Sequence, residues 1–123
     1  MTAHPIGNAV LVVSVEIDEA DVEELDRWYE EEHGPERMAM PGFVSMRRFR
    51  SSDGAPQFLA IYELESPDAA TSPTYMSQTP TQWSKDVQAK WKQWDRHVWV
   101  QVSSATRADT APATDTAPAD TAE

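Results

Sequence analysis

Runs of apolar residues alternate along the chain with segments in which apolar residues recur every three or four positions. Four of the runs have the length and apolar content of β-strands, and they cover residues 9–16, 43–50, 57–64 and 97–103. The turn-forming segment 52–56, Ser-Asp-Gly-Ala-Pro, separates the second run from the third. The pattern therefore predicts four strands, with a hairpin formed by the middle two.

The first segment with helical spacing runs from about residue 20 to His33. Leu25 and Tyr29 lie on its apolar face, and acidic residues fill its first turns, as the helix dipole favours. Gly34-Pro35 is expected to interrupt this helix, and residues 36–40 to add a short extra turn. The sequence thus predicts a helix that ends beside a histidine.

A second helix is predicted from residue 81 to residue 94, because Pro80 opens the segment and Trp83, Val87 and Trp91 recur at a spacing of four. The whole order is then strand, helix, strand, strand, helix, strand. This is the βαββαβ order of ferredoxin-like α+β folds, in which a four-stranded antiparallel sheet carries both helices on one face.

The opposite face of such a sheet would be bare, yet the strands place apolar side chains on both faces. In the last predicted strand, for example, Val98 and Val100 alternate with Trp99. A sheet that is apolar on both sides needs a second cover, and a second copy of the chain is the simplest one. We therefore expect a homodimer packed sheet against sheet.

The composition argues against several classes of function. A formal net charge of -11 over 123 residues disfavours nucleic-acid binding, which needs a basic surface. The chain has no cysteine and its 3 histidines are far apart in the sequence, so we expect no metal site. No apolar run approaches the roughly 20 residues of a membrane span. Residues 1–5 do not resemble a secretory signal. We expect a cytoplasmic protein without membrane contact.

The chain changes character near residue 106. From there it consists mostly of Ala, Thr, Asp and Pro, and the sequence Asp-Thr-Ala-Pro-Ala at 109–113 returns at 115–119. It holds no large apolar side chain whose burial would offset the entropy of ordering. We expect one folded domain over residues 1–105 and a disordered tail over residues 106–123.

His33 follows Leu25 and Tyr29 in the apolar series of the first helix, so it is expected to face the core. An imidazole in a partly dry pocket titrates near neutral pH and can move protons, which predicts a catalytic acid or base. Tyr29, one turn earlier, would lie about 6 Å away between Cβ atoms and could hold a carbonyl oxygen or donate a proton. The alternative for both is structural: a hydrogen-bonded core histidine and a core aromatic residue.

The pattern Trp28-Tyr29-x3-His33-x-Pro35, followed by Pro41-Gly42-Phe43 and an arginine-rich strand, resembles the EthD-like branch of the dimeric α+β barrel superfamily. Segment 58–64, Phe-Leu-Ala-Ile-Tyr-Glu-Leu, looks like the third strand of that branch, and the resemblance covers residues 10–102. It implies a ferredoxin-like protomer paired into a barrel, with a cleft between each sheet and its own helices. It also implies that the histidine lines the cleft.

Further residues are expected to line this cleft and bind a substrate: Trp28, Arg37, Met40, Phe43, Arg48, Tyr62, Trp83 and His97. An arginine that faces the cleft could bind a carboxylate or an enolate. Arg47 and Arg48 are expected on opposite faces of one strand, so at most one of them can do so. His97 opens the last predicted strand and could instead lie at a solvated strand end.

These residues predict a small-molecule enzyme that acts on an apolar, aromatic or polyketide-like substrate. The expected chemistry is cofactor-independent proton transfer, in an isomerisation, a cyclisation, a dehydration or the oxygenation of a phenol, with His33 as acid or base. No nucleotide or phosphate-binding motif is present, and no cofactor is expected. Two alternatives stay open. One is a non-catalytic ligand-binding or accessory protein, and the other is a haem-binding monooxygenase with His33 as axial ligand.

Overall fold

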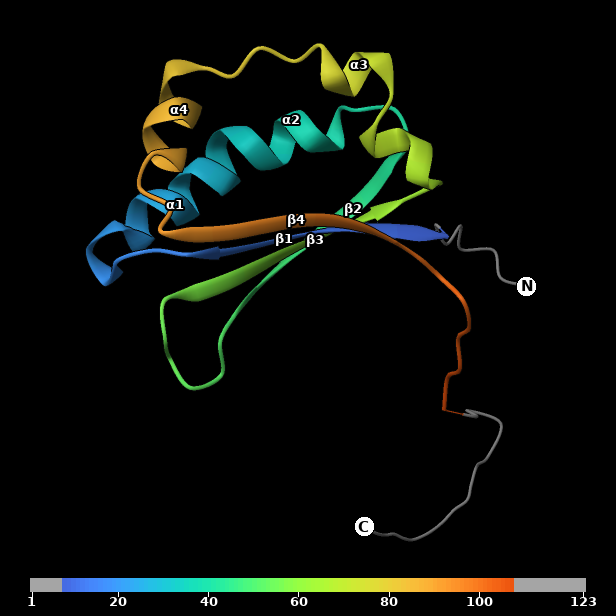
Figure 1. The fold of residues 1–123 in the computed structure, drawn as a ribbon, viewed down its shortest axis with the longest axis horizontal. Helices are drawn as coiled ribbons and strands as arrows, with labels where there is room; N and C mark the ends of the chain where they lie inside the picture. Colours follow the sequence, from blue (N-terminus) through green and yellow to red (C-terminus); the bar gives the residue numbers. More distant parts are fainter. Residues whose placement is uncertain (1–7, 108–123) are drawn as a thin grey trace, which may run out of the picture.

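A computed structural model describes residues 8–107, which form two layers (Figure 1). One layer is an antiparallel sheet of four strands in the order β2-β3-β1-β4. The other layer consists of the helices, which all lie on one face of that sheet (Figure 1). The fold is ferredoxin-like α+β, which confirms the architecture predicted from the order of the elements.

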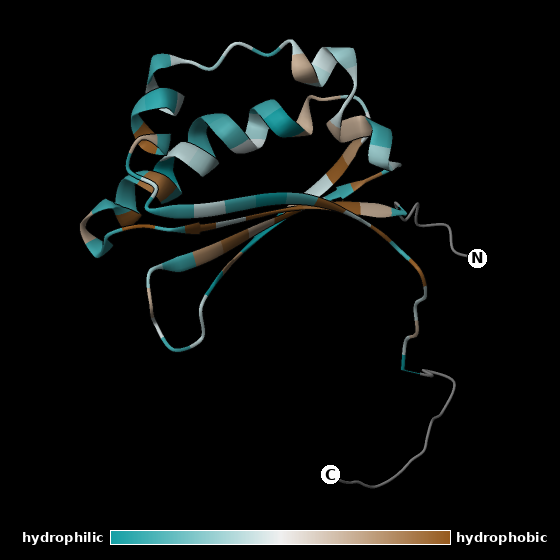
Figure 2. Ribbon diagram, viewed as in Figure 1, coloured by the Kyte–Doolittle hydropathy of each residue, from teal (hydrophilic) through white to brown (hydrophobic). Residues whose placement is uncertain are grey.

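Three of the four strands have the predicted bounds: β1 is Ala9–Glu16, β2 is Phe43–Arg50 and β3 is Gln57–Leu64. The tight turn predicted between β2 and β3 is present, with Gly54 at a φ of 86°. Glycine is favoured there because a Cβ makes this left-handed conformation costly. Hydrophobic residues recur along β1 and the strands beside it (Figure 2), as expected for the centre of the sheet.

One helical segment leads from β1 to β2 and crosses the sheet (Figure 1). It begins as a 3-10 turn (η1, Glu19–Asp21) and α1 (Val22–Trp28), widens into a π-helical turn (η2, Tyr29–His33) and ends as α2 (Gly34–Met38). The predicted interruption at Gly34-Pro35 was wrong, because the helix continues through both residues.

The wide turn explains why Pro35 does not break the helix. Pro35 has no N–H to donate, and in an α-helix its ring would collide with the carbonyl of Glu31, four residues earlier. Here the Gly34 N–H bonds instead to the Tyr29 carbonyl, five residues earlier. Regular bonding resumes where the Ala39 N–H donates to the Pro35 carbonyl at 3.1 Å. Gly34 is needed at this point, since a Cβ would lie 2.5 Å from the Tyr29 carbonyl oxygen.

The second predicted helix is also corrected. A short 3-10 turn (η3, Pro67–Ala70) and α3 (Pro73–Met76) precede α4, which spans only Gln82–Gln88, and β4 spans Gln93–Val100 instead of residues 97–103. β4 pairs with β1 along its whole length. Residues 93–94 join the sheet because they pair with the backbone N–H and C=O groups of the central strand β1. This pairing outweighs the helical spacing of the tryptophans.

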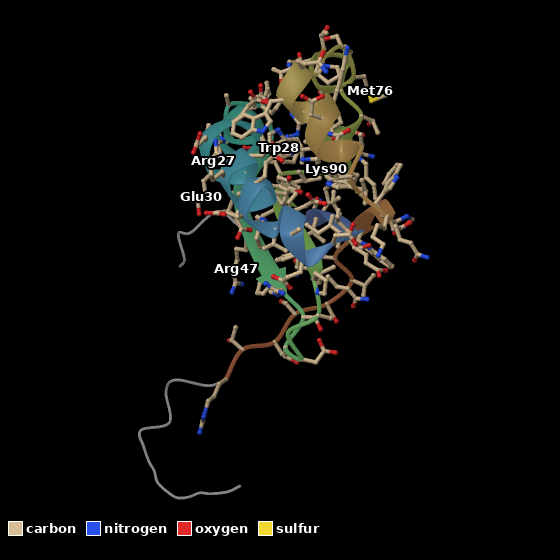
Figure 3. All side chains as sticks on the ribbon, turned by 90° about the vertical axis from the view of Figure 1, so that its left-hand side faces the viewer. Arg27, Trp28, Glu30, Arg47, Met76 and Lys90 are labelled. Carbon is tan, nitrogen blue, oxygen red and sulfur yellow. The ribbon has the colours of Figure 1, made fainter. Side chains whose placement is uncertain are left out.

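α4 is attached to the long helical segment by the half-buried carboxylate of Glu32. Glu32 Oε2 accepts hydrogen bonds from the hydroxyls of Thr81 at 2.6 Å and Ser84 at 3.1 Å. The Ser84 hydroxyl in turn accepts from the indole N–H of Trp28 at 3.1 Å. Trp28 therefore lies on the side of the helical segment that faces α4 (Figure 3). This network fixes the position of α4 above the sheet.

The face of the sheet away from the helices carries exposed apolar side chains. Phe49, Leu59 and Trp99 alternate with the core-facing residues of their strands and are 38%, 39% and 55% exposed. Arg47 belongs to this face, where its guanidinium lies 4.9 Å from the centre of the Phe49 ring. The prediction that Arg47 and Arg48 point to opposite faces is confirmed, since Arg48 contacts Tyr29 on the helix side.

Within residues 8–107, no helix is both long and apolar enough to cross a membrane. The predicted tail falls almost wholly outside the described residues, as do the residues from which a secretory signal was judged unlikely. The domain boundary at residue 105 stays a prediction.

Candidate functional site

His33 lies in the layer between the helices and the sheet, at the end of the π-helical turn, and is 9% exposed. Its imidazole stacks on the indole of Trp28 with 4.2 Å between ring centres, and Tyr29 meets it edge-on at 5.3 Å. None of the described residues hydrogen-bonds to the imidazole. The structural alternative required a hydrogen-bonded core histidine, and residues 8–107 do not provide its partner.

The environment of His33 disfavours the imidazolium ion. Burial is the main cause and the positive charge of Arg37 adds to it, so the pKa of His33 falls from 6.5 to about 3. The sequence predicted a histidine that titrates near neutral pH, and this prediction was wrong because it underestimated the dryness of the site. His33 is therefore a neutral imidazole at pH 7, with lone-pair density available to accept a proton.

Two tyrosines lie beside His33 and are held as neutral phenols. Burial raises the pKa of Tyr29, partly offset by the charge of Arg48, and burial also raises the pKa of Tyr62. The two hydroxyls influence one another's ionisation, yet the Tyr62 hydroxyl has no partner in good hydrogen-bond geometry among the described residues. The pair can therefore donate hydrogen bonds but does not supply a phenolate.

A cavity of about 540 Å³ opens beside these groups, a volume typical of small-molecule sites. Its lining includes the predicted residues Tyr29, His33 and Arg37. The remaining lining residues are Val13, Tyr75, Lys85, Gln88, Ala89, Trp91, Trp94 and Arg96. Indole and phenol rings form much of the wall, which suits a flat apolar ligand.

A second cavity of about 420 Å³ adjoins the first, since His33, Arg37, Tyr75, Gln88 and Arg96 line both. A third hollow of about 450 Å³ lies at another place on the sheet, near the turn between β2 and β3, and includes neither a histidine nor a tyrosine. We take the first two as the candidate site because they contain the buried imidazole.

The other predicted site residues are distributed around the cavity rather than in it. The Trp28 indole stacks on the imidazole of His33. Tyr62 and Phe43 pack against each other in the core, with 5.8 Å between their ring centres. Met40 is buried in the same core. Arg48 pairs with Asp26 at 2.8 Å.

Trp83 and His97 do not reach the cavity. The Trp83 indole donates to Glu24 of α1 at 3.2 Å, and Arg27 of α1 lies over its ring. His97 belongs to the face of the sheet without helices, where its ring lies 4.6 Å from that of Trp99. The prediction that His97 shares a cleft with His33 was wrong, because β4 begins earlier than expected and its alternation turns this side chain away.

The sequence reasoning missed several lining residues, above all Arg96 and Tyr75. Arg96 follows Trp94 on the helix-facing side of β4, opposite Val13 of β1. Its guanidinium donates to the Ala70 carbonyl at 3.2 Å and lies 5.2 Å from the centre of the Tyr75 ring. A predicted strand that began at residue 93 would have included Arg96. It would also have placed Arg96 on the same face as Val98, because side chains two residues apart in a strand share a face. Tyr75 lies in a connection without a readable periodicity.

Among residues 8–107, no three His, Asp or Glu side chains are grouped closely enough to hold a metal ion. The buried donors of the site suit an organic ligand better: Arg37 Nη1 and Trp91 Nε1 both lack a hydrogen-bond partner within the described part of the chain.

The fold and the cavity define a ferredoxin-like α+β protein with a cavity lined by aromatic side chains between the helices and the sheet. The chain belongs to the family described as "Domain of unknown function (DUF4286)", whose model matches residues 8–94. The resemblance to the EthD-like branch therefore remains a prediction. No curated protein sequence matches the chain.

Solved structures with the same fold include a monooxygenase from Streptomyces coelicolor, the product of ActVA-Orf6, in complex with the ligand nanaomycin D. It shares 15% sequence identity at a TM-score of 0.68, over 85% of this chain and 95% of that one. A dimeric ferredoxin-like protein from an uncultured marine organism shares 11% identity at a TM-score of 0.65, over 81% and 92% of the two chains. At these identities the likeness shows the fold.

Proposed function

We propose that the protein is an enzyme that carries out proton-transfer chemistry on an aromatic, polyketide-like small molecule, with His33 as the base. The observation that carries this proposal is one cavity in which a buried, neutral imidazole lies together with an arginine and a wall of aromatic rings. The reaction class extends from isomerisation, cyclisation and dehydration to the oxygenation of an electron-rich phenol by O₂.

The first step is the transfer of a proton from a phenol or an acidic C–H of the substrate to an imidazole nitrogen of His33. Alone, this step is uphill, because burial and Arg37 oppose the imidazolium ion. The substrate anion formed in the same step offsets the cost of burial and the repulsion by Arg37, because it lies between the imidazolium ion and the Arg37 guanidinium. The base is therefore effective only when the substrate is bound, which protects the resting protein from unproductive protonation.

The remaining groups hold the substrate. Tyr29 lines the cavity as a neutral phenol and can donate a hydrogen bond to a carbonyl or phenolate oxygen. Trp91 and Trp94 provide flat apolar surface against which an aromatic ring can stack. The fold shared with a monooxygenase that was solved with nanaomycin D supports an aromatic ligand for this cavity.

The test is turnover of a panel of naphthols and dihydroxynaphthalenes, followed by absorbance and by O₂ consumption in parallel. We expect at least one substrate to react, and His33→Gln, which keeps the size and polarity of the side chain, to lower kcat by about 100-fold or more. A control variant, Arg27→Gln at an exposed position of α1 outside both cavities, should retain wild-type rates. Equal rates for His33→Gln and the wild type would refute the catalytic role.

The alternative is a non-catalytic binding or accessory protein of the same fold, in which His33 only orients the ligand. Its specific support is the low pKa of His33, which makes the imidazole a weak base in the absence of ligand. Saturable binding of several aromatic ligands, with no product from any of them, would favour this alternative.

We further propose that the chain forms a homodimer through the open face of the sheet. Three partly exposed apolar side chains, Phe49, Leu59 and Trp99, belong to that face, and one solved structure of this fold is described as dimeric. Size-exclusion chromatography with light scattering should give twice the 13.8 kDa chain mass. Trp99→Asp should shift the population towards the monomer, and a monomeric wild type at micromolar concentration would contradict the proposal.

A further inference from the structure

The candidate cavity gathers positive charge in an otherwise acidic protein. Arg37, Arg96 and Lys85 line the cavity of about 540 Å³, which has no acidic side chain in its lining. The neighbouring cavity adds a single acidic residue, Glu36. With a formal net charge of -11 for the chain, such a local excess of cations is unexpected unless it serves a ligand.

The two arginines are not used in ion pairs. In residues 8–107, salt bridges pair Arg27, Arg48, Arg50, Lys90 and Lys92 with carboxylates, but none involves Arg37 or Arg96. Arg48 differs from them in its ion pair: it contacts the Tyr29 ring and pairs with Asp26, although its Nε and Nη2 are buried without a hydrogen-bond partner among the described residues. Arg37 and Arg96 lack such an ion pair, although an acidic residue precedes each of them in the chain, Glu36 on α2 and Asp95 on β4.

The guanidinium groups of Arg37 and Arg96 both lie close to the ring of Tyr75. The Arg37 guanidinium carbon lies 5.0 Å and that of Arg96 5.2 Å from the centre of the Tyr75 ring, and both side chains line both cavities. The hydrogen bond from Arg96 to the Ala70 carbonyl fixes one of them. The two cations are therefore held near each other without an anion between them, an arrangement that costs free energy until an anion binds.

Buried donors without acceptors indicate where that anion would bind. Arg37 Nη1 and the indole Nε1 of Trp91 are both buried and have no hydrogen-bond partner among the described residues. Buried donors are nearly always paired, because an unpaired one loses its hydration without compensation. Two of them in the lining of one cavity indicate a ligand with acceptor oxygens.

We propose that this cavity binds an aromatic carboxylate, with the carboxylate group held by Arg37 and Arg96 and the ring stacked among Tyr75, Trp91 and Trp94. Arginine suits this role because its planar guanidinium donates two parallel hydrogen bonds to a carboxylate. The inference rests on the proposed function and narrows it to acidic aromatic substrates. Burial is the main cause of the lowered pKa of His33 and the charge of Arg37 is the second, and a bound carboxylate would offset this second cause.

The experiment compares 2-naphthoate with 2-naphthamide, which has nearly the same shape and no charge, by isothermal titration calorimetry on the full chain at pH 7.5. We expect 2-naphthoate to bind at least about tenfold more tightly, and its affinity to fall as salt is raised. Arg37→Gln and Arg96→Gln should each remove most of this preference, while the control Arg27→Gln, at an exposed position outside both cavities, should keep it. Circular dichroism and melting temperature verify that the variants are folded.

Equal affinities for the two ligands, or binding of neither, would overturn the inference, and so would a loss of preference in Arg27→Gln as large as in Arg37→Gln. The comparison within the wild type does not depend on the stability of any variant. The outcome is separable from that of the proposed function. Turnover that needs His33 without a preference for carboxylates would refute only the anion site. Selective carboxylate binding without turnover of any hydroxynaphthoate would refute only the catalysis.

Discussion

Acidification should destabilise the protein through His33 in a range of pH where most carboxylates are still charged. The folded-state pKa of about 3 lies below the ordinary value of 6.5. Between these two values the unfolded chain binds a proton at this residue and the folded chain does not. Above pH 6.5 the neutral His33 contributes fully to the free energy of unfolding. This contribution is lost progressively as the pH falls from 6.5 towards 3.

The size of the effect follows from the shift. Each pH unit below 6.5 costs about 1.4 kcal/mol, so at pH 4.5 the loss due to His33 amounts to about 2 to 3 kcal/mol. The side chain is only 9% exposed, so solvent screens little of this effect. His33→Gln removes the titrating group. Between pH 6.5 and pH 4.5 the free energy of unfolding of this variant should therefore fall by about 2 to 3 kcal/mol less than that of the wild type.

Chemical denaturation of both proteins at pH 7.5, 6.0 and 4.5 measures the difference, because the carboxylates titrate equally in the two. In addition, NMR of the imidazole carbons should show His33 still neutral at pH 5. In Arg37→Gln the pKa of His33 should rise, since the guanidinium contributes to lowering it. Parallel pH dependences for the wild type and His33→Gln would refute the reasoning, as would an imidazole that titrates near 6.5.

Three further predictions concern the framework of the site. Gly34→Ala should destabilise the fold by about 1 to 3 kcal/mol, since the new Cβ would lie 2.5 Å from the Tyr29 carbonyl oxygen. Helix propensity alone predicts that alanine stabilises the helix, so a variant more stable than the wild type in chemical denaturation would refute the steric argument. Ser84→Ala should cost about 1 to 2 kcal/mol, because the half-buried carboxylate of Glu32 and the buried indole of Trp28 lose a shared partner. An unchanged denaturation midpoint would contradict this. Gly42→Ala should be worse than Gly54→Ala although φ is positive at both, because only the former Cβ has a close neighbour, at 2.7 Å; equal melting temperatures would exclude that contact as the cause.

Hydrophobic patterning predicted the sheet well where each strand is bounded by turn-forming residues. β1, β2 and β3 have the expected limits because their apolar runs end at Asp, Gly and Pro. β4 lacks such a boundary at its start. Its first residues, Gln93 and Trp94, continue the helical spacing of α4, and only their pairing with β1 identifies them as a strand. A non-local contact of this kind is not visible in local periodicity.

The same limitation affected the site. Tyr29 and His33 lie on one predicted helix, and their spacing predicted that they share a face. Arg37 was expected beyond an interruption at Gly34-Pro35, and it joins them because the helix continues through both residues. All three line the cavity. Arg96 and Tyr75 reach it from segments whose neighbours are set by the tertiary fold. The pKa of His33 could not be predicted either, because it depends on how completely Trp28 and the helices exclude water.

The π-helical turn makes the winding of the helix, and not only its composition, a determinant of the binding site. An α-helix advances by about 100° per residue and the wider turn over Tyr29–His33 advances by less, so the same residues wound as a regular α-helix would point everything after His33 in another direction. Arg37 would then point away from the cavity, although every side chain of the site would still be present. Homologues of the same length in which this turn is an ordinary α-helical one should therefore have a different ligand, even where their histidine, arginine and tyrosine are the same.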